Sequence, residues 1–186
     1  MRHGVPLREQ GVWINAEGFG ATHYNRVDPT EVEAAKRQAS IEDWGVFCCQ
    51  LQAEVEIAIA GWLAEFRYHG VDALAERVVR IAAEEASCCV AVEQGNDISV
   101  AANVVAAYFR AERGTADVLA DDIVRACNAV KSELARTLRR PRTWQAVETI
   151  AFALVERHHL SPQEVEDIVA AIALPRAKPK SIALAL

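Results

Sequence analysis

Asp97 is the strongest candidate in the sequence for a residue that does chemistry, because it stands at the entry to a long uncharged stretch. Gly95 and Asn96 before it favour a turn, and residues 98–109 after it carry no charge. A helix that is apolar on every side must be enclosed by other helices, so we expect this stretch to be buried. The Asp97 carboxylate then lies at the mouth of the core. It serves there either as a metal ligand or as a helix-entry residue that satisfies free amides and complements the helix dipole.

The cysteines and histidines are the other residues that bind metals, but they lack the spacing of a metal site. The five cysteines form two adjacent pairs, Cys48-Cys49 and Cys88-Cys89, and the single Cys127. Neighbours on a helix point about 100° apart, so one pair does not readily aim both sulfurs at one ion. We interpret the thiols as small, reduced core residues, with a redox or metal role as the weaker alternative. His158-His159 is predicted to lie in the last turn of a helix, where the dipole favours histidine.

Glu84 and Glu85 could also supply a pair of catalytic carboxylates. Adjacent side chains on a helix diverge, however, so they do not face a common substrate. We therefore expect these two glutamates to lie on a solvated face.

Hydrophobic periodicity predicts a mainly α-helical chain with a small N-terminal β-hairpin or sheet. Residues 1–28 contain two β-leaning runs, Gly11–Ile14 and Ala21–Tyr24, separated by a glycine-containing loop. A helix that opens at the cap Ser40 and stops near His69-Gly70 has the clearest apolar stripe. Its stripe residues are Trp44, Phe47, Leu51, Val55, Ala58, Trp62 and Phe66.

Further helices follow from the same spacing and from their capping residues. They are predicted over residues 29–39, about 71–88, 98–113, 117–138, 144–159 and 161–174. Val78 and Ile81 belong to the expected apolar stripe of the helix at 71–88. Leu119 and Ile123 belong to that of the helix at 117–138. Ser161 is the expected cap of the last helix.

The length and composition of the chain favour one domain with one hydrophobic core, and they argue against several classes of partner. A chain of 186 residues that is 52% hydrophobic suits a single-domain helical bundle over residues 1–174, with strands in 1–28, helices in 29–174 and a flexible tail at 175–186. A net charge of −6 and the short basic run Arg139–Arg142 argue against a nucleic-acid partner. No uncharged run approaches the roughly 20 residues that span a bilayer, and a signal pattern is missing at the N-terminus. We therefore expect a cytoplasmic protein with no membrane partner.

Four stretches, in order along the chain, match features of one family. They are Val12–Ile14 with Glu17–Thr22, then Ala60–Glu65, then Asn96–Ala101, and finally Trp144–Val165. Together they resemble the peptidase domain of the FtsH family of ATP-dependent zinc proteases. The second stretch is similar to the family's Gly-Gly-Arg-Ala-Ala-Glu helix, in which Gly61, Ala64 and Glu65 match while Trp62 replaces the arginine. Glu65 either keeps the role of the family glutamate or holds a neighbouring backbone or arginine.

The third stretch is similar to the family's Ser-Asn-Asp-Leu-x-x-Ala segment, whose aspartate is the third zinc ligand. The resemblance therefore implies that Asp97 is a candidate zinc ligand. The spacing between Gly61 and Asp97 is longer than is typical of the family, which places the extra helix at 71–88 between them.

The resemblance also implies parts that this sequence lacks. A zinc peptidase needs two histidines one helical turn apart with a glutamate beside them, H-E-x-x-H, and no two of the five histidines lie four apart. By the family's order this motif falls upstream of Met1. A phosphate-binding Gly-x-x-x-x-Gly-Lys-Ser/Thr loop is absent as well. We expect an FtsH-peptidase-like domain, truncated or degenerate, that is proteolytically inactive as given and binds zinc only if the missing motif is supplied.

The alternative function belongs to another class. A chain that has lost one core helix exposes apolar surface, and such patches mark protein interaction sites. The many aromatic and aliphatic residues therefore also suit a non-enzymatic helical module that binds a protein partner or associates with itself.

Overall fold

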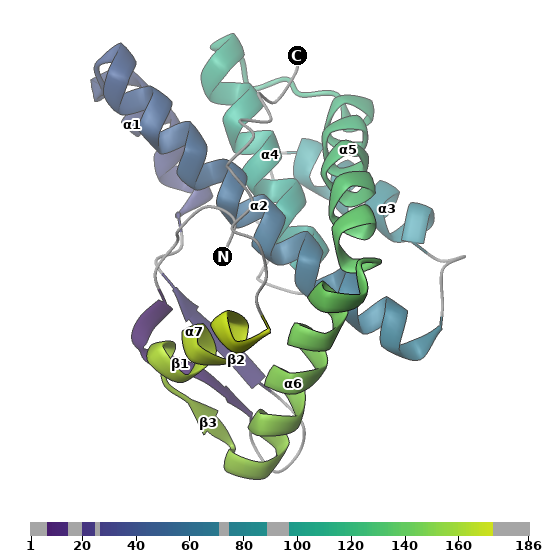
Figure 1. Cartoon of the computed structure of the whole chain (residues 1–186). Helices are drawn as coiled ribbons and strands as arrows, with labels where there is room; N and C mark the ends of the chain where they lie inside the picture. The colour runs from purple at the N-terminus through teal and green to yellow at the C-terminus, as the bar shows by residue number, and fades with distance from the viewer. Residues whose placement is uncertain (1–6, 15–19, 25–26, 71–74, 89–96, 173–186) are drawn as a thin grey trace. The chain divides into compact units, whose positions relative to one another are not determined.

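The structure is a computed structural model, and it describes residues 7–14, 20–24, 27–70, 75–88 and 97–172. It confirms a mainly α-helical chain with a small antiparallel sheet near the N-terminus (Figure 1). The backbone forms two compact units, one from residues 1–26 and 137–182 and the other built on residues 27–136. The single domain over residues 1–174 stays a prediction.

The larger unit is entirely helical. Its elements are η1 (Pro29–Glu31), α1 (Val32–Gln38), α2 (Ile41–His69), α3 (Ala75–Ser87), α4 (Asp97–Arg113) and α5 (Ala120–Leu138). Helix α2 starts and stops where its sequence predicts. The Ser40 side chain accepts a hydrogen bond from the Asp43 amide at 3.1 Å, and Gly70 ends the helix in the left-handed conformation with φ 69°.

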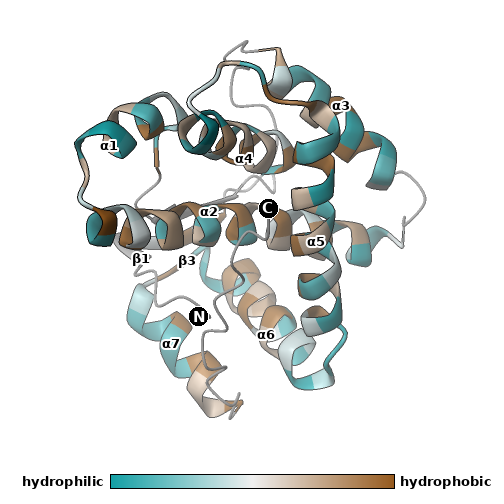
Figure 2. Cartoon of the chain, turned by 90° about the horizontal axis from the view of Figure 1, so that it is seen from above, coloured by the Kyte–Doolittle hydropathy of each residue, from teal (hydrophilic) through white to brown (hydrophobic). Residues whose placement is uncertain are grey.

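Helix α4 lies at the centre of this unit. It packs along both α2 and α3, and ten of its residues between Ile98 and Phe109 are buried. Figure 2 shows hydrophobic and hydrophilic residues alternating along the helices, α2 and α4 included. The expected burial of the uncharged stretch 98–109 is confirmed. The predicted stripe of α2 is confirmed too, from buried Trp44 to half-buried Phe66.

Two predicted core residues are wrong. Ile81 is 45% exposed, because α3 packs on α4 through its small side chains instead. The buried residues of α3 are Val79, Ala82, Ala83 and Ala86. Leu119 is 67% exposed because α5 begins one residue later, at Ala120, and buries Ile123 and Cys127.

The smaller unit combines a sheet with two helices. Its elements are β1 (Leu7–Ile14), β2 (Gly20–Tyr24), α6 (Pro141–Arg157), β3 (His159–Leu160) and α7 (Pro162–Ala171). The predicted hairpin is confirmed, since β1 pairs antiparallel with β2. The third strand was not predicted from the sequence: β3 pairs antiparallel with β1, so the sheet order is β2-β1-β3. Both α6 and α7 pack on β1.

The histidine pair lies partly outside its predicted helix. His158 is the C-cap of α6 in the left-handed conformation, with φ 62°, and His159 is already in β3 opposite Trp13. Leu160 is fully buried, and this burial explains why the chain leaves the helix here and returns to the sheet. Ser161 then caps α7 and forms the predicted capping box with Glu164.

Gly11 allows β1 and β3 to approach closely. Its φ is +59°, and the pairing of β1 with β2 is irregular between Leu7 and Val12, as in a β-bulge. A Cβ atom at Gly11 would lie 2.1 Å from the carbonyl oxygen of Leu160. No other residue type fits this position.

Helix α2 is, within the described part of the chain, the one helix long and apolar enough to cross a membrane. That test rests on length and composition, and 44% of its apolar window is buried inside the structure. Core helices of globular proteins pass the same test. The expected flexible tail at 175–186 lies outside the described residues.

Candidate functional site at the start of α4

Asp97 is the first residue of α4, and its carboxylate lies against the backbone of α2 at Gly61. A Cβ atom at Gly61 would be 2.6 Å from Oδ2 of Asp97 and 3.7 Å from its Cγ. The first distance is shorter than any ordinary contact of a Cβ atom, so a side chain at residue 61 would occupy the space of the carboxylate. The structure thus brings together two positions that the sequence singled out separately. Asn96, which belongs to the predicted turn before Asp97, lies outside the described residues.

Two other residues of the Ala60–Glu65 stretch, Trp62 and Glu65, differ in their exposure. Glu65 is exposed on α2 and lies four residues after Gly61, which places both on one face of the helix. Trp62, which stands where the resembled family has arginine, is only 5% exposed and packs on Phe66 with ring centroids 4.8 Å apart. Trp62 is therefore a core residue of this unit, and it brings no charge to the position where the resembled family has arginine.

A zinc site needs at least three protein ligands, and the described residues at Asp97 provide one carboxylate. Nowhere among the described residues do three or more His, Cys, Asp or Glu side chains gather closely enough to hold a metal ion. These residues therefore do not by themselves fit zinc. The assignment of Asp97 as a third ligand stays a prediction.

The cysteines only partly follow the expectation that they are core residues. Cys127 is buried and Cys48 half-buried, but Cys49 and Cys88 are exposed. The divergence of neighbours on α2 explains the first pair, since Cys48 faces inward and Cys49 outward. Burial raises the pKa of Cys127 to about 12, and it raises the pKa of Cys48 as well. Neither of these two thiols is therefore an activated nucleophile. Cys89 lies outside the described residues.

The remaining sequence candidates lie at the surface. Glu84 and Glu85 are both exposed on α3, as expected for a solvated face. His69, at the end of α2, is exposed, and so are His158 and His159.

A polar cluster that the sequence did not suggest joins α1, α2 and α4. We call Lys36, Trp44, Tyr108 and Glu112 the Glu112 cluster. Glu112 Oε1 accepts hydrogen bonds from Lys36 Nζ at 2.8 Å and from Trp44 Nε1 at 2.5 Å. The Lys36 ammonium also lies 4.5 Å from the centre of the Trp44 ring, which in turn stacks on Tyr108. These contacts hold α1 on the other two helices.

The electrostatics of the Glu112 cluster indicate a structural clamp. The hydrogen bond from Lys36, opposed by burial and helped by Trp44, holds the pKa of Glu112 below its ordinary value. Burial, followed by the negative charge of Glu112, raises the pKa of Tyr108 to about 12. Glu112 is therefore ionised and Tyr108 neutral at physiological pH. This assignment leaves neither of them poised for acid-base catalysis near neutral pH.

Three polar residues are buried in the middle of α2. Gln52 donates to Glu56 at 2.9 Å, and Glu54 accepts a hydrogen bond from the Val27 amide at 3.3 Å. Every residue from 51 to 56 is buried, so α2 is enclosed on every side there. No pattern in the sequence indicated this enclosure, because polar and apolar residues alternate through the segment. Each buried glutamate has a hydrogen-bond donor, as a buried carboxylate requires.

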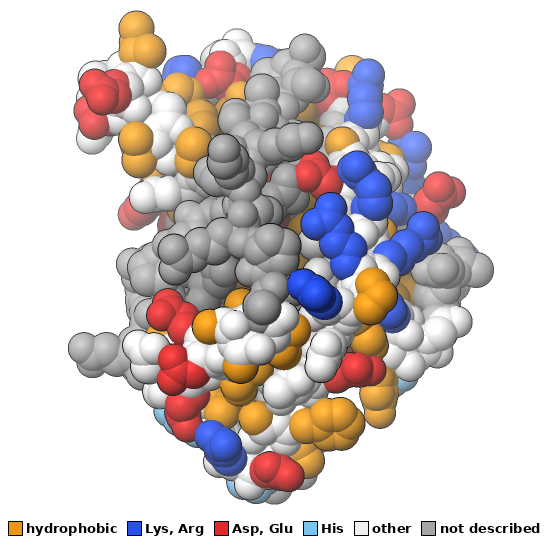
Figure 3. Space-filling view, in the orientation of Figure 1, with side chains coloured by type: hydrophobic (Ala, Val, Ile, Leu, Met, Phe, Trp, Pro, Cys, Tyr) orange, Lys and Arg blue, Asp and Glu red, His pale blue; other side chains and the backbone are white. Residues whose placement is uncertain are grey.

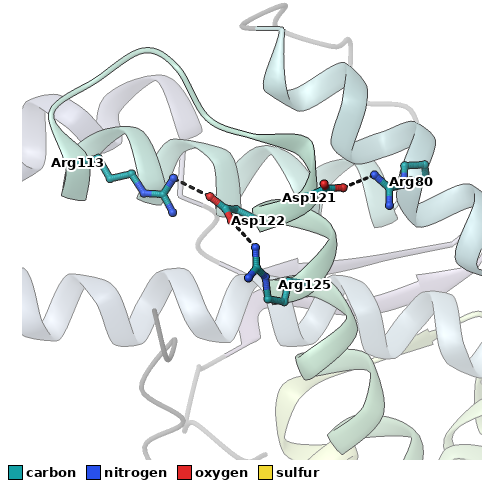
Figure 4. Close-up of polar contacts among 5 residues, drawn as sticks. All are labelled: Arg80, Arg113, Asp121, Asp122 and Arg125. Carbon is teal, nitrogen blue, oxygen red and sulfur yellow. Dashed lines mark hydrogen bonds and ion pairs between the residues drawn. The ribbon is translucent and has the colours of Figure 1, made fainter.

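An ionic network connects α3, α4 and α5. Asp122 pairs with Arg113 at 2.7 Å and with Arg125 at 2.6 Å, while the neighbouring Asp121 pairs with Arg80 (Figure 4). Only Asp122 is well shielded, at 16% exposure of its side chain. We interpret this ionic network as a surface tie between helices.

The comparisons with known proteins give no relative: no family model, no curated protein and no solved structure matches this chain.

Proposed function

We propose that this chain is an FtsH-peptidase-like domain that is proteolytically inactive over its 186 residues. The observation that supports this proposal best is the contact between Gly61 and Asp97. They belong to two different stretches that resemble the family, and the fold places the carboxylate of one directly against the backbone of the other.

The order of the elements adds support. The hairpin β1-β2 comes first, then α2 with Gly61, then α4 with Asp97, and last the pair α6 and α7 with the Ser161 cap between them. The extra helix expected between Gly61 and Asp97 corresponds to α3.

Inactivity follows from the ligands that this sequence provides. The H-E-x-x-H motif is absent from the 186 residues, and one carboxylate does not hold zinc or activate water. If the motif is supplied in the chain, Asp97 would complete its set of three ligands, and zinc would provide the Lewis acid for hydrolysis.

The test combines nucleotide sequence with metal analysis. The purified 186-residue chain should retain no stoichiometric zinc and should not cleave casein. Stoichiometric zinc together with casein cleavage by this chain would overturn the proposed inactivity. The nucleotide sequence upstream of Met1 is then searched for an in-frame H-E-x-x-H codon pattern.

If that pattern is present, the longer chain allows a direct test of Asp97. Asp97→Ala should lower its zinc content at least tenfold, in line with the loss of a metal ligand or its support. Asp43→Ala is the matched control, since Asp43 also lies in the first turn of a helix. Equal zinc content in the Asp97→Ala and Asp43→Ala proteins, both folded, would refute the role of Asp97.

A second candidate function, self-association or binding of a protein partner, is favoured by the outer face of α6. Phe152 is 70% exposed and Val155 63% exposed, and their spacing of three residues puts them on one face with exposed Ala151. In Figure 3, hydrophobic side chains lie at the surface in the region of α6. Exposed aromatic and aliphatic side chains of this kind are typical of interaction surfaces.

Sedimentation velocity over a range of concentrations tests this second candidate. The wild-type chain should associate with rising concentration, and Phe152→Glu should abolish the association. Thr149→Glu, also exposed on α6, is the control and should leave it intact. A wild-type chain that sediments as a monomer throughout and retains no partner in affinity purification argues against an interaction module.

A further inference from the structure

Gly61 is unusual among the helical glycines because something lies where its side chain would be. Its hypothetical Cβ would be 2.6 Å from Asp97 Oδ2. Gly45, in the same helix α2, has nothing within 4 Å of the corresponding point. The two glycines are both exposed and both inside a helix, so they differ mainly in what faces them.

The backbone of α2 does not explain a glycine at this position. Gly61 lies eight residues before the end of the helix and, unlike Gly70, does not have a positive φ. Glycine inside a helix is less stable than alanine, because it loses more conformational freedom on folding. A close approach by another group is the physical reason that remains, and the Asp97 carboxylate is that group.

We infer that Gly61 is a positioning residue for the Asp97 carboxylate: its missing side chain leaves the space that Oδ2 occupies against α2. The inference rests on the proposed function, in which Asp97 is the residue that meets a metal. Asp97 is exposed and its side chain has two torsions, so a methyl group at residue 61 would move the carboxylate to another rotamer. Among the described residues no other group lies within 4 Å of this point, so the backbone of α2 need not shift.

The experiment compares Gly61→Ala with Gly45→Ala in the 186-residue chain. Two quantities are measured at one fixed pH, the urea midpoint of unfolding and the ¹³C resonance of Asp97 Cγ. Gly45→Ala should raise the urea midpoint and leave the Asp97 resonance unchanged. Gly61→Ala should move that resonance, and should raise the urea midpoint less. An Asp97 resonance that is the same in both variants would overturn the inference.

The double variant Gly61→Ala with Asp97→Ala guards against a failure to fold. With the carboxylate removed, alanine at residue 61 has the same freedom as alanine at residue 45. Relative to Asp97→Ala alone, the double variant should therefore gain as much in urea midpoint as Gly45→Ala gains in the wild type. A double variant that gains nothing, or that fails to fold while Asp97→Ala folds, contradicts the inference.

The positioning role and the proposed function fail in distinguishable ways. If the proposed function is wrong, the zinc content of the longer chain does not depend on Asp97, while Gly61→Ala still shifts the Asp97 resonance in the 186-residue chain. If Gly61 is not a positioning residue, the Asp97 resonance is unchanged in Gly61→Ala, whether or not the longer chain binds zinc through Asp97.

Discussion

One oxygen atom of Glu112 connects three helices. Glu112 lies on α4, and its Oε1 accepts from Lys36 of α1 and from Trp44 of α2. Its side chain is 27% exposed, so water screens the pair with Lys36 only in part. Such a partly shielded charge, with two donors on one atom, contributes more than an isolated surface ion pair.

Glu112→Gln should therefore destabilise the chain at pH 7 by about 1 kcal/mol. Because the pKa of Glu112 is lowered in the folded state, the carboxylate stabilises the fold above its unfolded pKa of about 4.3. This contribution is lost as the pH falls through the folded pKa. The difference between wild type and variant should thus shrink as the pH is lowered below about 4. Urea unfolding at a series of pH values measures it.

Glu148→Gln is the control for this prediction. Glu148 also accepts from a tryptophan, Trp144 Nε1 at 2.7 Å, but the pair is exposed and lies within one helix. Its loss should change the unfolding free energy by less than about 0.5 kcal/mol. A similar effect of both variants, or a Glu112→Gln effect that is independent of pH, would show that the shielded charge is not the cause.

At the scale of residues, the sequence indicated single candidate residues but not the residues that they contact in the fold. Asp97 was identifiable, because a single charge precedes a long uncharged stretch. Its contact with Gly61 was not, since periodicity assigns residues to faces of one helix and gives no distance between two helices. The Glu112 cluster was invisible for the same reason: Lys36 is 76 residues and Trp44 68 residues away from Glu112 along the chain.

At the scale of elements, the two adjacent aspartates of α5 in the ionic network differ in how well they are shielded from water. Asp122 contacts arginines of both α4 and its own helix with a side chain that is 16% exposed, whereas the Asp121 side chain is 71% exposed. Screening by water weakens the second pair much more. The ion pair of Asp122 that links α5 to α4 should therefore contribute more to stability than the ion pair of Asp121 that links α5 to α3.

Asp122→Asn should lower the free energy of unfolding by about 0.5 to 1 kcal/mol at low ionic strength. The loss should be smaller in about 1 M salt, where the Debye length is near 3 Å. Asp121→Asn should stay within about 0.5 kcal/mol under both conditions. Urea unfolding of the two variants at both salt concentrations provides the measurement, and an equal loss for both would contradict the role of shielding.

Whole helices were predicted better than the ways in which they pack. The apolar spacing and the Ser40 and Gly70 signals located α2 from end to end. In α3, however, apolar spacing favoured Ile81, while the small residues around Ala83 form the face that meets α4. The two-residue strand β3 is too short for any alternation to reveal it. It exists because β1 provides an edge with which it pairs.

At the scale of the whole molecule, the prediction of a single domain means that the two compact units unfold together. The sequence predicts one domain over residues 1–174, and a single domain of this size unfolds as one cooperative system. Damage confined to one unit then lowers the stability of every residue. Gly11, deep in the smaller unit, is a suitable place for such damage.

Gly11→Ala should destabilise the chain by about 2 kcal/mol or more, because alanine is strained at a φ of +59° and its Cβ would collide with the Leu160 carbonyl. Native-state hydrogen exchange of the buried amides of Ile59 in α2 and Val105 in α4 is the measurement. If residues 1–174 form one domain, these amides should exchange about 30-fold faster in the variant, since 2 kcal/mol corresponds to a factor of that size. Unchanged exchange there, with protection lost only in the sheet, α6 and α7, would show instead that the two units are separate domains.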